Sequence, residues 1–506
     1  MLNNTLSAPL SATLTLDNDF ELSPVDPRLF GGLAEHLGRH IYTGIYEPTH
    51  PTATAEGFRG DVIALVRELD ISVVRYPGGN FVSNYDWENG VGPLSERPAR
   101  LDLAWHTTEP NTFGTNEFAG WCRAVGAAPM IAVNLGTRGA ADAQRLVEYC
   151  NHPRGTRYSD LRRSHGVSEP HGIKLWCLGN EMDGDWQTGH KEAHEYGRVA
   201  AEASKMMKWT DPGIETVLCG SSSAEMKTFG RWEWDALHAA SAHVDYLSLH
   251  QYFGNRERDT PRFLADPDRM SAFIEQTTAL CDAVCAAKKQ KRKIHLSFDE
   301  WNVWYHADAP LPDKYESWQV APPILEDHYT MEDALVVGGC LITLLNHCDR
   351  VKIACLAQIV NVIAPILTVP GGGAWRQTIF YPFAQASALG RGTVLRVGGT
   401  LPERDGRKTL AVAAVRSEQG DRLTLFAVNR ELTDTTPLSV NLRGFGAARV
   451  LRHTVLRHDD LTSVNTEAAP NTVVPSAGGG AKVEGEVLTV RLAPASWNVI
   501  EVGLRG

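Results

Sequence analysis

The sequence predicts an α/β fold, a (β/α)8 barrel, followed by a C-terminal antiparallel β-sandwich. Between residues 25 and 385, eight short apolar segments alternate with amphipathic segments of helical periodicity. Eight such repeats over roughly 350 residues are typical of a TIM barrel with long loops. After residue 385 the pattern changes to alternation of single apolar and polar residues, which indicates strands with one buried face.

The predicted barrel strands are apolar on both faces, as parallel strands covered by helices should be. They end near Glu35, Pro77, Asn134, Glu181, Ser221, His250, Glu300 and Asn361. The segments between them carry apolar residues at helical spacing, for example Val62, Leu65, Val66 and Leu69. A doubly wound open sheet is the alternative. It is disfavoured because polar residues follow nearly every strand, whereas an open sheet concentrates them at one switch point.

Period-two alternation marks the predicted sandwich at residues 438–442 and 488–492, and again near the N-terminus at 12–16. The N-terminal strand is expected to join the C-terminal sheet, because a lone strand before a barrel has no other partner. We therefore predict three segments. Residues 1–24 form an N-terminal strand segment of the β-domain, residues 25–385 the barrel, and residues 386–506 the β-sandwich.

Composition and charge limit the possible partners and the location. The 506 residues are 43% hydrophobic and carry a formal net charge of −11, which argues against a nucleic-acid or anionic-membrane partner. The N-terminus lacks the pattern of a signal peptide, and no apolar run approaches a membrane span. Nine cysteines, scattered through apolar segments, fit buried free thiols in a reducing compartment. We therefore expect a cytoplasmic protein.

Two predicted strands, within residues 176–181 and 295–302, lead to the glutamates Glu181 and Glu300. In a parallel barrel the C-terminal ends of the strands meet at one rim, so these carboxylates can meet although 119 residues separate them. Retaining glycoside hydrolysis needs such a pair. One carboxylate attacks the anomeric carbon, and the other protonates the leaving oxygen and later deprotonates water. The hypothesis is a glycosidase with Glu181 as acid/base and Glu300 as nucleophile.

The rest of the predicted rim is rich in amides and aromatic rings, as binding of a neutral polyhydroxylated ring requires. A cluster of Arg and Lys is missing from it, which argues against a phosphorylated or carboxylated substrate. The rim residues are Glu35, Asn80, Asn134, Asn180, Glu181, His250, Tyr252, Glu300, Trp301 and Gln358.

Six short motifs resemble those of the α-L-arabinofuranosidases of glycoside hydrolase family 51. They are Phe30-Gly-Gly-Leu-Ala-Glu-His36, Arg75-Tyr-Pro-Gly-Gly-Asn80, Gly179-Asn-Glu181, His250-Gln-Tyr252, Asp299-Glu-Trp-Asn302 and Gln358. The Asn-Glu pair is shared across the wider clan of retaining barrel glycosidases. Glu35 and the Gly-Gly-Asn80 turn narrow the resemblance to the arabinofuranosidase branch.

The resemblance implies a retaining exo-hydrolase that releases terminal non-reducing α-L-arabinofuranose from arabinose-containing oligosaccharides. It implies the acid/base role for Glu181 and the nucleophile role for Glu300. It also implies a jelly-roll-like β-domain and a homo-oligomer, a hexamer. The residues expected to bind the furanose are Glu35, Asn80, Asn180, Tyr252 and Gln358. His250 is expected to support Glu300.

Several residues have a structural alternative. Glu35 could pair with Arg75 across adjacent strands. His36 and His40 have metal-ligand spacing, but the glutamate of a zincin motif is missing between them. Trp105 and Trp304 either line the sugar site or hold their own loops. The loop 305–324 either covers the leaving-group side or is an exposed insertion.

The alternatives for function are a β-xylosidase or endo-glucanase on the same scaffold, a non-catalytic sugar-binding protein, and a metal-dependent sugar isomerase. The isomerase would need carboxylates and histidines around two cations, whereas the predicted rim is dominated by amides and aromatic rings. Two carboxylates suffice for acid/base and nucleophilic chemistry. We therefore expect no cofactor and no metal.

Overall fold

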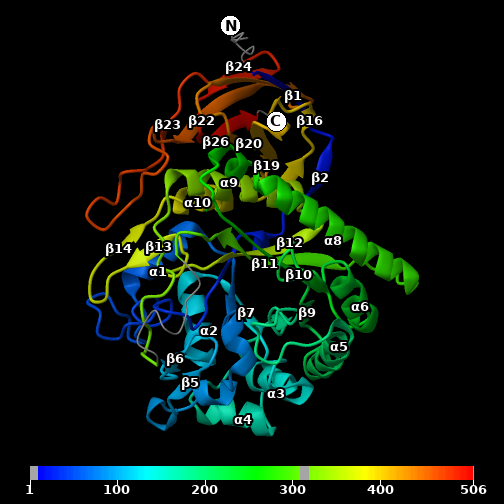
Figure 1. Cartoon of the computed structure of the whole chain (residues 1–506), viewed down its shortest axis with the longest axis vertical. Coiled ribbons are helices and arrows are strands. Elements are labelled where there is room, and N and C mark those ends of the chain that lie inside the picture. Colours follow the sequence, from blue (N-terminus) through cyan, green and yellow to red (C-terminus); the bar gives the residue numbers. More distant parts are fainter. Residues whose placement is uncertain (1–9, 308–317, 505–506) are drawn as a thin grey trace.

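The computed structural model describes residues 10–307 and 318–504. Its larger part is a closed barrel of eight strands, each hydrogen-bonded in parallel to both neighbours. The predicted barrel is therefore confirmed (Figure 1). In chain order the strands are β3 (Gly31–Leu33), β4 (Val73–Tyr76), β7 (Ala128–Ala132), β8 (Leu175–Leu178), β9 (Glu215–Leu218), β10 (Tyr246–Phe253), β11 (His295–Val303) and β12 (Val351–Ala357).

Helices surround the barrel, and α1 is a typical amphipathic one. In α1 the buried residues include Val62, Leu65, Val66 and Leu69, the apolar positions that the sequence places on one face. The helices are α1 (Gly60–Leu69), α2 (Thr115–Val125), α3 (Ala140–Asn151), α4 (Arg157–Ser164), α5 (Ala193–Thr210), α6 (Arg231–Ala240), α7 (Thr260–Ala265), α8 (Pro267–Ala287), α9 (Met331–Asn346) and α10 (Phe380–Leu389).

Short elements decorate the loops. Three two-stranded ribbons are β5 (Arg100–Asp102) with β6 (Thr107–Glu109), β13 (Ile366–Thr368) with β14 (Ala374–Arg376), and β17 (Glu403–Arg404) with β18 (Arg407–Lys408). Turns of 3-10 helix span Pro27–Leu29, Asn80–Asn84, Trp87–Gly90 and Leu94–Glu96. The β5–β6 hairpin and the turn at Asn80–Asn84 both follow β4, and both contribute to the rim of the barrel.

Two sheets form the C-terminal sandwich, with orders β16-β1-β21-β25-β24 and β2-β15-β19-β20-β26-β22-β23. The pairings are antiparallel except that β1 runs parallel to β21. No hairpin connects β1 to β21, so no tight turn dictates their relative direction. The strands are β1 (Ala12–Asp17), β2 (Glu21–Pro24), β15 (Thr393–Leu395), β16 (Gly398–Gly399), β19 (Leu410–Arg416), β20 (Arg422–Asn429), β21 (Thr436–Arg443), β22 (Ala448–Leu456), β23 (Ser476–Ala477), β24 (Lys482–Glu484), β25 (Val487–Leu492) and β26 (Ser496–Leu504).

The period-two pattern explains the sandwich core. Along β21, Leu438, Val440 and Leu442 are buried, while the residues between them are only partly so. These side chains belong to an apolar cluster to which β1, β19, β20, β25 and β26 also contribute. The limits of the three predicted segments, at residues 24 and 385, stay a prediction.

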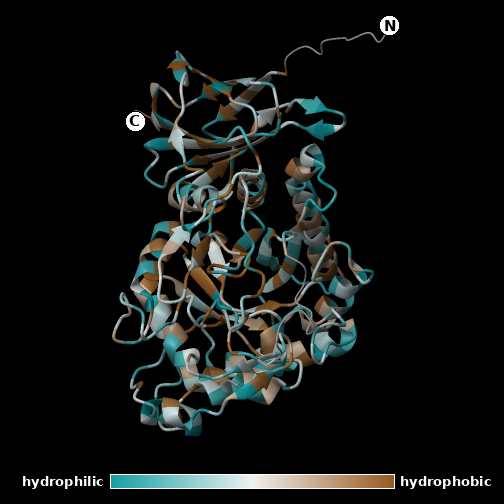
Figure 2. Cartoon of the chain, turned by 60° about the vertical axis from the view of Figure 1, so that its left-hand side comes forward, coloured by the Kyte–Doolittle hydropathy of each residue, from teal (hydrophilic) through white to brown (hydrophobic). Residues whose placement is uncertain are grey.

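Helix α9 lies between the barrel and the sandwich (Figure 1). Residues 331–345 are buried all round the helix, because one side faces the barrel and the other packs on the sandwich. Gly338 lies against the ring of Trp497, and Trp497 Nε1 donates to Gln385 of α10. Hydrophobic residues accordingly gather in the barrel strands and at this junction, while the outer helices carry hydrophilic stripes (Figure 2).

All nine cysteines are buried and unpaired. In residues 10–307 and 318–504, no helix has the length and apolar character needed to cross a membrane.

Candidate active site

A bulge in β11 places two consecutive carboxylates inside the barrel. Ser248 of β10 pairs with Ser297, but His250 pairs with Glu300, so β11 carries one more residue than its neighbour. A regular strand would turn Asp299 and Glu300 to opposite faces. The extra residue instead lets both contact the barrel interior: Asp299 bonds Ser248 and His250, and Glu300 bonds Tyr252.

The Glu300 carboxylate is buried and held at both oxygens. Arg75 Nη1 donates to Oε1 at 2.7 Å, and the Tyr252 hydroxyl donates to Oε2 at 3.0 Å. Burial raises the pKa of Glu300, with Glu181 and Asp299 adding to the effect and His250 and Arg75 opposing it. Arg75 thus supplies a positive charge that favours the ionised form of the buried Glu300 carboxylate.

Glu181 follows β8 with a left-handed backbone, φ +41°, which is uncommon for a residue other than glycine. Strained conformations of this kind persist where the surroundings fix them, and they concentrate at functional sites. Both carboxylate oxygens are engaged. Oε1 lies 2.9 Å from His250 Nδ1, and Oε2 accepts a hydrogen bond of 2.8 Å from Trp186 Nε1.

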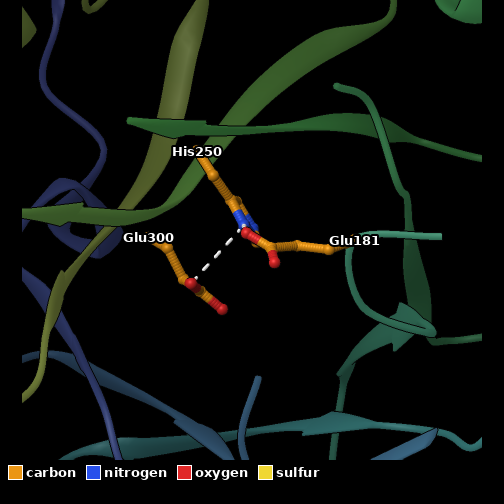
Figure 3. Close-up of side chains that lie close together, drawn as sticks. All are labelled: Glu181, His250 and Glu300. Atoms are coloured by element: carbon orange, nitrogen blue, oxygen red, sulfur yellow. Dashed lines mark hydrogen bonds and ion pairs between the residues drawn. The ribbon is translucent and has the colours of Figure 1, made fainter. Parts of the chain in front are cut away.

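His250 lies between the two glutamates (Figure 3). Its Nδ1 is 2.9 Å from Glu181 and 3.5 Å from Glu300, while Nε2 is 3.0 Å from Asp299. Burial disfavours the charged imidazolium. However, the charge of Glu300 and the bonds to Asp299 and Glu181 outweigh burial and raise the pKa of His250 to about 10. The imidazolium therefore balances part of the negative charge of the three carboxylates.

Glu35, Trp105 and Gln358 form a second group beside Glu300. Glu35 Oε1 accepts from Trp105 Nε1 at 3.1 Å and from the Phe81 backbone at 3.1 Å, and Oε2 accepts from Gln358 Nε2 at 3.2 Å. Burial, followed by the charge of Glu300, raises the pKa of Glu35 to about 8. A neutral carboxyl at this position can both donate to and accept from a sugar hydroxyl.

The glycine pair before Asn80 lets Glu35 and Glu300 approach each other. A Cβ on Gly79 would lie 3.1 Å from Glu35 Oε2 and 3.2 Å from Glu300 Oε1, and a Cβ on Gly78 would overlap the Glu35 side chain. Any side chain here would occupy the space between the two carboxylates. Asn80, half-buried, opens the 3-10 turn that follows.

Asn180 is bonded to Arg75 and to Gln187. Its Oδ1 accepts from Arg75 Nη2 at 2.6 Å, and its Nδ2 donates to Gln187 Oε1 at 3.3 Å. Arg75 therefore orients Glu300 and Asn180 with one planar guanidinium, a geometry that lysine cannot reproduce.

The structure brings the predicted site residues together. Trp304 is among them and packs edge-on against Tyr252, with ring centroids 5.4 Å apart. Two residues of the wider predicted rim, Trp301 and Asn134, are exceptions. Trp301 lies fully buried in the core, because the residue after Glu300 turns to the outer face of the strand. Asn134 uses its amide to hold its own loop, bonding the backbone of residues 85, 136 and 137.

Contacts bear on two of the structural alternatives. Arg75 forms its ion pairs with Glu300 and Asp299, not with Glu35. Both ring nitrogens of His36 are bonded, to Glu109 and Tyr76, and His40 is fully buried. Of the loop 305–324, residues 308–317 lie outside the described residues.

One group in the described part of the chain has ligand atoms that converge as for a metal ion: Glu181, His250 and Glu300, within 4.8 Å of one another. Two positive charges, one within this group and one in contact with it, make the group a poor site for a metal cation. Arg75 already contacts Glu300, and His250 itself is an imidazolium below a pH of about 10, where both its nitrogens donate. Carboxylate convergence at this distance suits the chemistry of a glycosidase instead.

Sequence reasoning gave Arg75, Asp299 and Trp186 no role in the chemistry. Arg75 had a signal, since it is a single charge in the buried strand Val73–Tyr76. Asp299 likewise interrupts an apolar strand. Trp186 had none, because it lies in an irregular loop and its hydrogen bond to Glu181 depends on the fold of that loop.

Comparisons with known proteins agree with this geometry. The models of the alpha-L-arabinofuranosidase 1 domain and the alpha-L-arabinofuranosidase C-terminal domain match residues 65–266 and 299–496. An intracellular exo-α-(1→5)-L-arabinofuranosidase of Halalkalibacterium halodurans is 53% identical over 98% of this chain and 99% of its own. An exo-α-(1→6)-L-arabinofuranosidase of Bifidobacterium longum is 48% identical over 97% of each chain.

Solved structures give the same result. A family 51 α-L-arabinofuranosidase from Bifidobacterium longum superposes with a TM-score of 0.92 at 42% identity, covering 98% of this chain and all of the other. With full-length relatives at this level of identity, the chain belongs to the α-L-arabinofuranosidases of glycoside hydrolase family 51.

Proposed function

We propose that the protein is a retaining exo-hydrolase that releases terminal non-reducing α-L-arabinofuranosyl residues from arabino-oligosaccharides. The observation that carries the proposal is the separation of the two carboxylates. An oxygen of Glu181 and an oxygen of Glu300 lie within 4.8 Å of each other. Retaining enzymes have carboxyl groups about 5–5.5 Å apart, whereas inverting enzymes need roughly 6.5–9.5 Å to admit a water.

In the first step Glu300 attacks the anomeric carbon from the β-face while Glu181 gives its proton to the glycosidic oxygen. Arg75 and Tyr252 hold the Glu300 oxygens, so the nucleophile needs no reorientation. In the second step water attacks the β-linked glycosyl-enzyme, and Glu181, now ionised, takes its proton. The α-configuration is restored, and Glu300 leaves as the carboxylate.

Sugar binding is assigned to the residues around this pair. Asn180, next to the acid/base, is assigned to the 2-hydroxyl, a contact that strengthens as the transition state gains oxocarbenium character. Glu35, Asn80 and Gln358 receive the remaining hydroxyls, and Trp105, Trp304 and Tyr252 supply apolar ring surface.

Exo action is supported by the hairpin that carries Trp105. Trp318 donates its backbone N–H to His106, and Thr108 donates to Gln319, so the hairpin β5–β6 is tied to the segment that precedes α9. Trp105, at the turn of this hairpin, bonds Glu35. A substrate chain passing the site on the Glu35 side would have to displace this connection.

The test is turnover of 4-nitrophenyl α-L-arabinofuranoside by the wild type, Glu300→Ala and Glu181→Ala, with and without azide. We expect Glu300→Ala to be inactive. Azide should rescue Glu181→Ala and give the α-arabinofuranosyl azide, because it attacks a β-linked intermediate. A β-azide from Glu181→Ala would mean that the two roles are exchanged. Turnover of β-D-xylosides or β-D-glucosides in place of the arabinoside would refute the proposed substrate.

Linkage, location and assembly complete the proposal. The curated relatives are named for both 1→5 and 1→6 linkages, so the preferred linkage is determined by comparing defined disaccharides. The word "intracellular" in several of their names supports a cytoplasmic location. The family resemblance implies a hexamer, which light scattering tests against a chain mass of 55.5 kDa.

A further inference from the structure

Gln187 is a buried glutamine in the loop that follows Glu181. Only 1% of the residue is exposed, and both ends of its amide are bonded. Oε1 accepts from Asn180 Nδ2 at 3.3 Å. Nε2 donates to the Asn80 carbonyl at 3.4 Å and to the Ser83 hydroxyl. An amide is costly to bury unless its polar atoms have partners, and Gln187 finds two of them on residues assigned to sugar binding.

The loop after β8 folds back on itself and so brings Gln187 to Asn180. The backbone N–H groups of residues 184, 187 and 190 donate to the carbonyls three residues earlier, at 2.9, 3.1 and 3.0 Å. Lys191 N donates to the Met182 carbonyl at 3.0 Å and closes the loop. Successive turns of this kind satisfy the backbone locally. The Gln187 side chain is therefore presented from a segment that is held by its own hydrogen bonds.

The hydrogen bonds through Gln187 have a fixed direction. The Arg75 guanidinium can only donate, so it must contact the oxygen of the Asn180 amide, and Nδ2 then faces Gln187. The Asn80 carbonyl can only accept, so the nitrogen of Gln187 must face it, and the oxygen of Gln187 faces Asn180. Turning the Gln187 amide over would oppose two acceptors at one end and two donors at the other. The two ends of the chain thus dictate the orientation of both amides.

The second hydrogen of Asn180 Nδ2 is the one left for the sugar. An amide nitrogen carries two hydrogens, and the contacts of Nδ2 with the described residues use one of them, in the bond to Gln187. Arg75 holds only the amide oxygen, and one hydrogen bond leaves the plane of the amide free to turn. Gln187 supplies the second point of attachment. With both ends held, the remaining N–H keeps one direction.

We propose that Gln187 is a positioning residue for the reaction: it orients the Asn180 amide so that an N–H is presented to the 2-hydroxyl of the sugar. The inference rests on the proposed function, since it assumes that Asn180 binds this hydroxyl. The 2-hydroxyl contact strengthens in the transition state. A misdirected Asn180 amide should therefore lower kcat/KM for the natural sugar and spare a substrate that lacks the hydroxyl.

The test compares Gln187→Met with the wild type on phenyl α-L-arabinofuranoside and on its 2-deoxy analogue. Methionine is unbranched like glutamine and fills the site, but it removes the amide. We expect kcat/KM for the arabinofuranoside to fall about 10- to 100-fold, because misplaced groups cost that much in pre-organised sites. The loss with the 2-deoxy analogue should be at least about tenfold smaller, because the contact is already missing there. Equal losses with the two substrates would overturn the positioning role.

Gln187→Glu is the conservative variant, and it keeps the oxygen that faces Asn180. The Ser83 hydroxyl can donate to the second oxygen of the new carboxylate, so the side chain remains anchored. The preference for the arabinofuranoside over the 2-deoxy analogue should therefore be greater in Gln187→Glu than in Gln187→Met. The same preference in both variants would show that the hydrogen bond to Asn180 does not matter.

A double-mutant cycle with Asn180→Ala tests whether Gln187 acts through Asn180. Once Asn180 is alanine, adding Gln187→Met should cause no further loss with the arabinofuranoside, whereas two multiplying losses would overturn the inference. The cycle also separates this inference from the proposed function. If Asn180→Ala itself lowers kcat/KM equally for both substrates, then Asn180 does not bind the 2-hydroxyl and the premise fails. If Asn180→Ala discriminates but Gln187→Met does not, only the role of Gln187 is refuted.

Gln377→Met is the matched control for loss of a buried amide. Gln377 is fully buried, and its side chain bonds the backbone of residues 327, 329 and 364. The substitution should lower the thermal midpoint, because it leaves these backbone groups without their partner. The ratio of the two kcat/KM values should stay at the wild-type value. A Gln377→Met enzyme with the same fall in this ratio as Gln187→Met would overturn the inference, since any buried glutamine would then have the effect.

Discussion

Arg75 Nη1 lies 2.7 Å from Glu300 Oε1, and both side chains are buried. The same guanidinium donates to Asn180 through Nη2. One cation from β4 thus fixes the Glu300 carboxylate on β11 and the amide of Asn180, which precedes Glu181 in the loop after β8. The geometry of the proposed reaction depends on this link across the barrel.

Two substitutions of Arg75 should separate the effect of its positive charge from the effect of its planar hydrogen-bonding geometry. Arg75→Lys keeps the positive charge, but one ammonium cannot bond Glu300 and Asn180 in a single plane. We expect kcat/KM to fall at least about 100-fold, because misplaced groups cost that much in pre-organised sites. Arg75→Met leaves buried carboxylates without their cation and should lower the free energy of unfolding by about 3–5 kcal/mol. Kinetics and urea denaturation test both, and a fully active lysine variant would contradict the role of the planar fork.

His250 should make stability depend on pH in the alkaline range. The carboxylates around it raise its pKa to about 10, above the value of 6.5 for the unfolded chain. A group whose folded pKa is raised stabilises the protein fully below the unfolded value, and this stabilisation is lost as the pH rises through the folded value. His250→Asn should therefore be destabilised most at pH 6, and the difference from wild type should shrink towards pH 10. Urea denaturation at several pH values tests this, and a constant difference would refute it.

The buried carboxyl of Glu35, which is assigned to sugar binding, should make the folded protein less stable as the pH rises. Burial and Glu300 raise its pKa to about 8, so between 4.5 and about 8 the folded chain retains a proton that the unfolded chain has lost. Over this range the wild type loses up to about 1.4 kcal/mol of stability per pH unit. Glu35→Gln does not titrate, so its stability relative to wild type should increase with pH and level off above pH 8. Its KM should rise, since the carboxyl is assigned to the sugar. A pH-independent difference in unfolding free energy would show that Glu35 titrates normally.

The fold could be predicted from the sequence because each of its signals is local. Eight apolar strands, helical periodicity as in Val62 to Leu69, and alternation as in Leu438 to Leu442 each need only neighbouring residues to be recognised. The sequence of α9 carries no such signal for its orientation. The helix is apolar on all sides, so its pattern does not indicate which side packs on the barrel and which on the sandwich. The parallel pairing of β1 with β21 joins strands more than 400 residues apart, and nothing local encodes its direction.

From the sequence, only those site residues could be predicted that lie at the C-terminal ends of the barrel strands. Glu35, Glu181, His250 and Glu300 follow from the rule that catalytic groups gather at one rim. The assignment of Trp301 to the rim was wrong, because it assumed that the residue after Glu300 also faces inward. The bulge that turns Asp299 inward depends on the register with β10 and β12, which the sequence does not display.

Removing metal ions should leave the activity unchanged. Glu181, His250 and Glu300 converge within 4.8 Å, but Arg75 and the imidazolium of His250 already supply the positive charge there. Dialysis against EDTA should therefore not reduce turnover of the aryl arabinofuranoside. Loss of activity on dialysis, with recovery on adding a divalent cation, would show that a metal takes part and that the two-carboxylate scheme is incomplete.

The junction between barrel and sandwich should tolerate no added volume at Gly338. A Cβ there would lie 2.6 Å from the Trp497 ring, which is buried, stacked on Phe426 and bonded to Gln385. Alanine gains about 1 kcal/mol of helix propensity over glycine, but overpacking a fixed core costs about 1–3 kcal/mol. We expect Gly338→Ala to lower the thermal midpoint.

Gly120 in α2 is the matched control for this substitution. A Cβ at Gly120 meets Phe58 at 3.5 Å, an ordinary contact, and neither glycine has a positive φ. The helix-propensity gain should therefore be realised, and Gly120→Ala should raise the thermal midpoint. Opposite signs for the two variants in calorimetry would locate the cost of Gly338→Ala in the Trp497 contact. If both variants stabilise the protein, then the junction can expand, and α9 does not couple the two domains as tightly as its burial indicates.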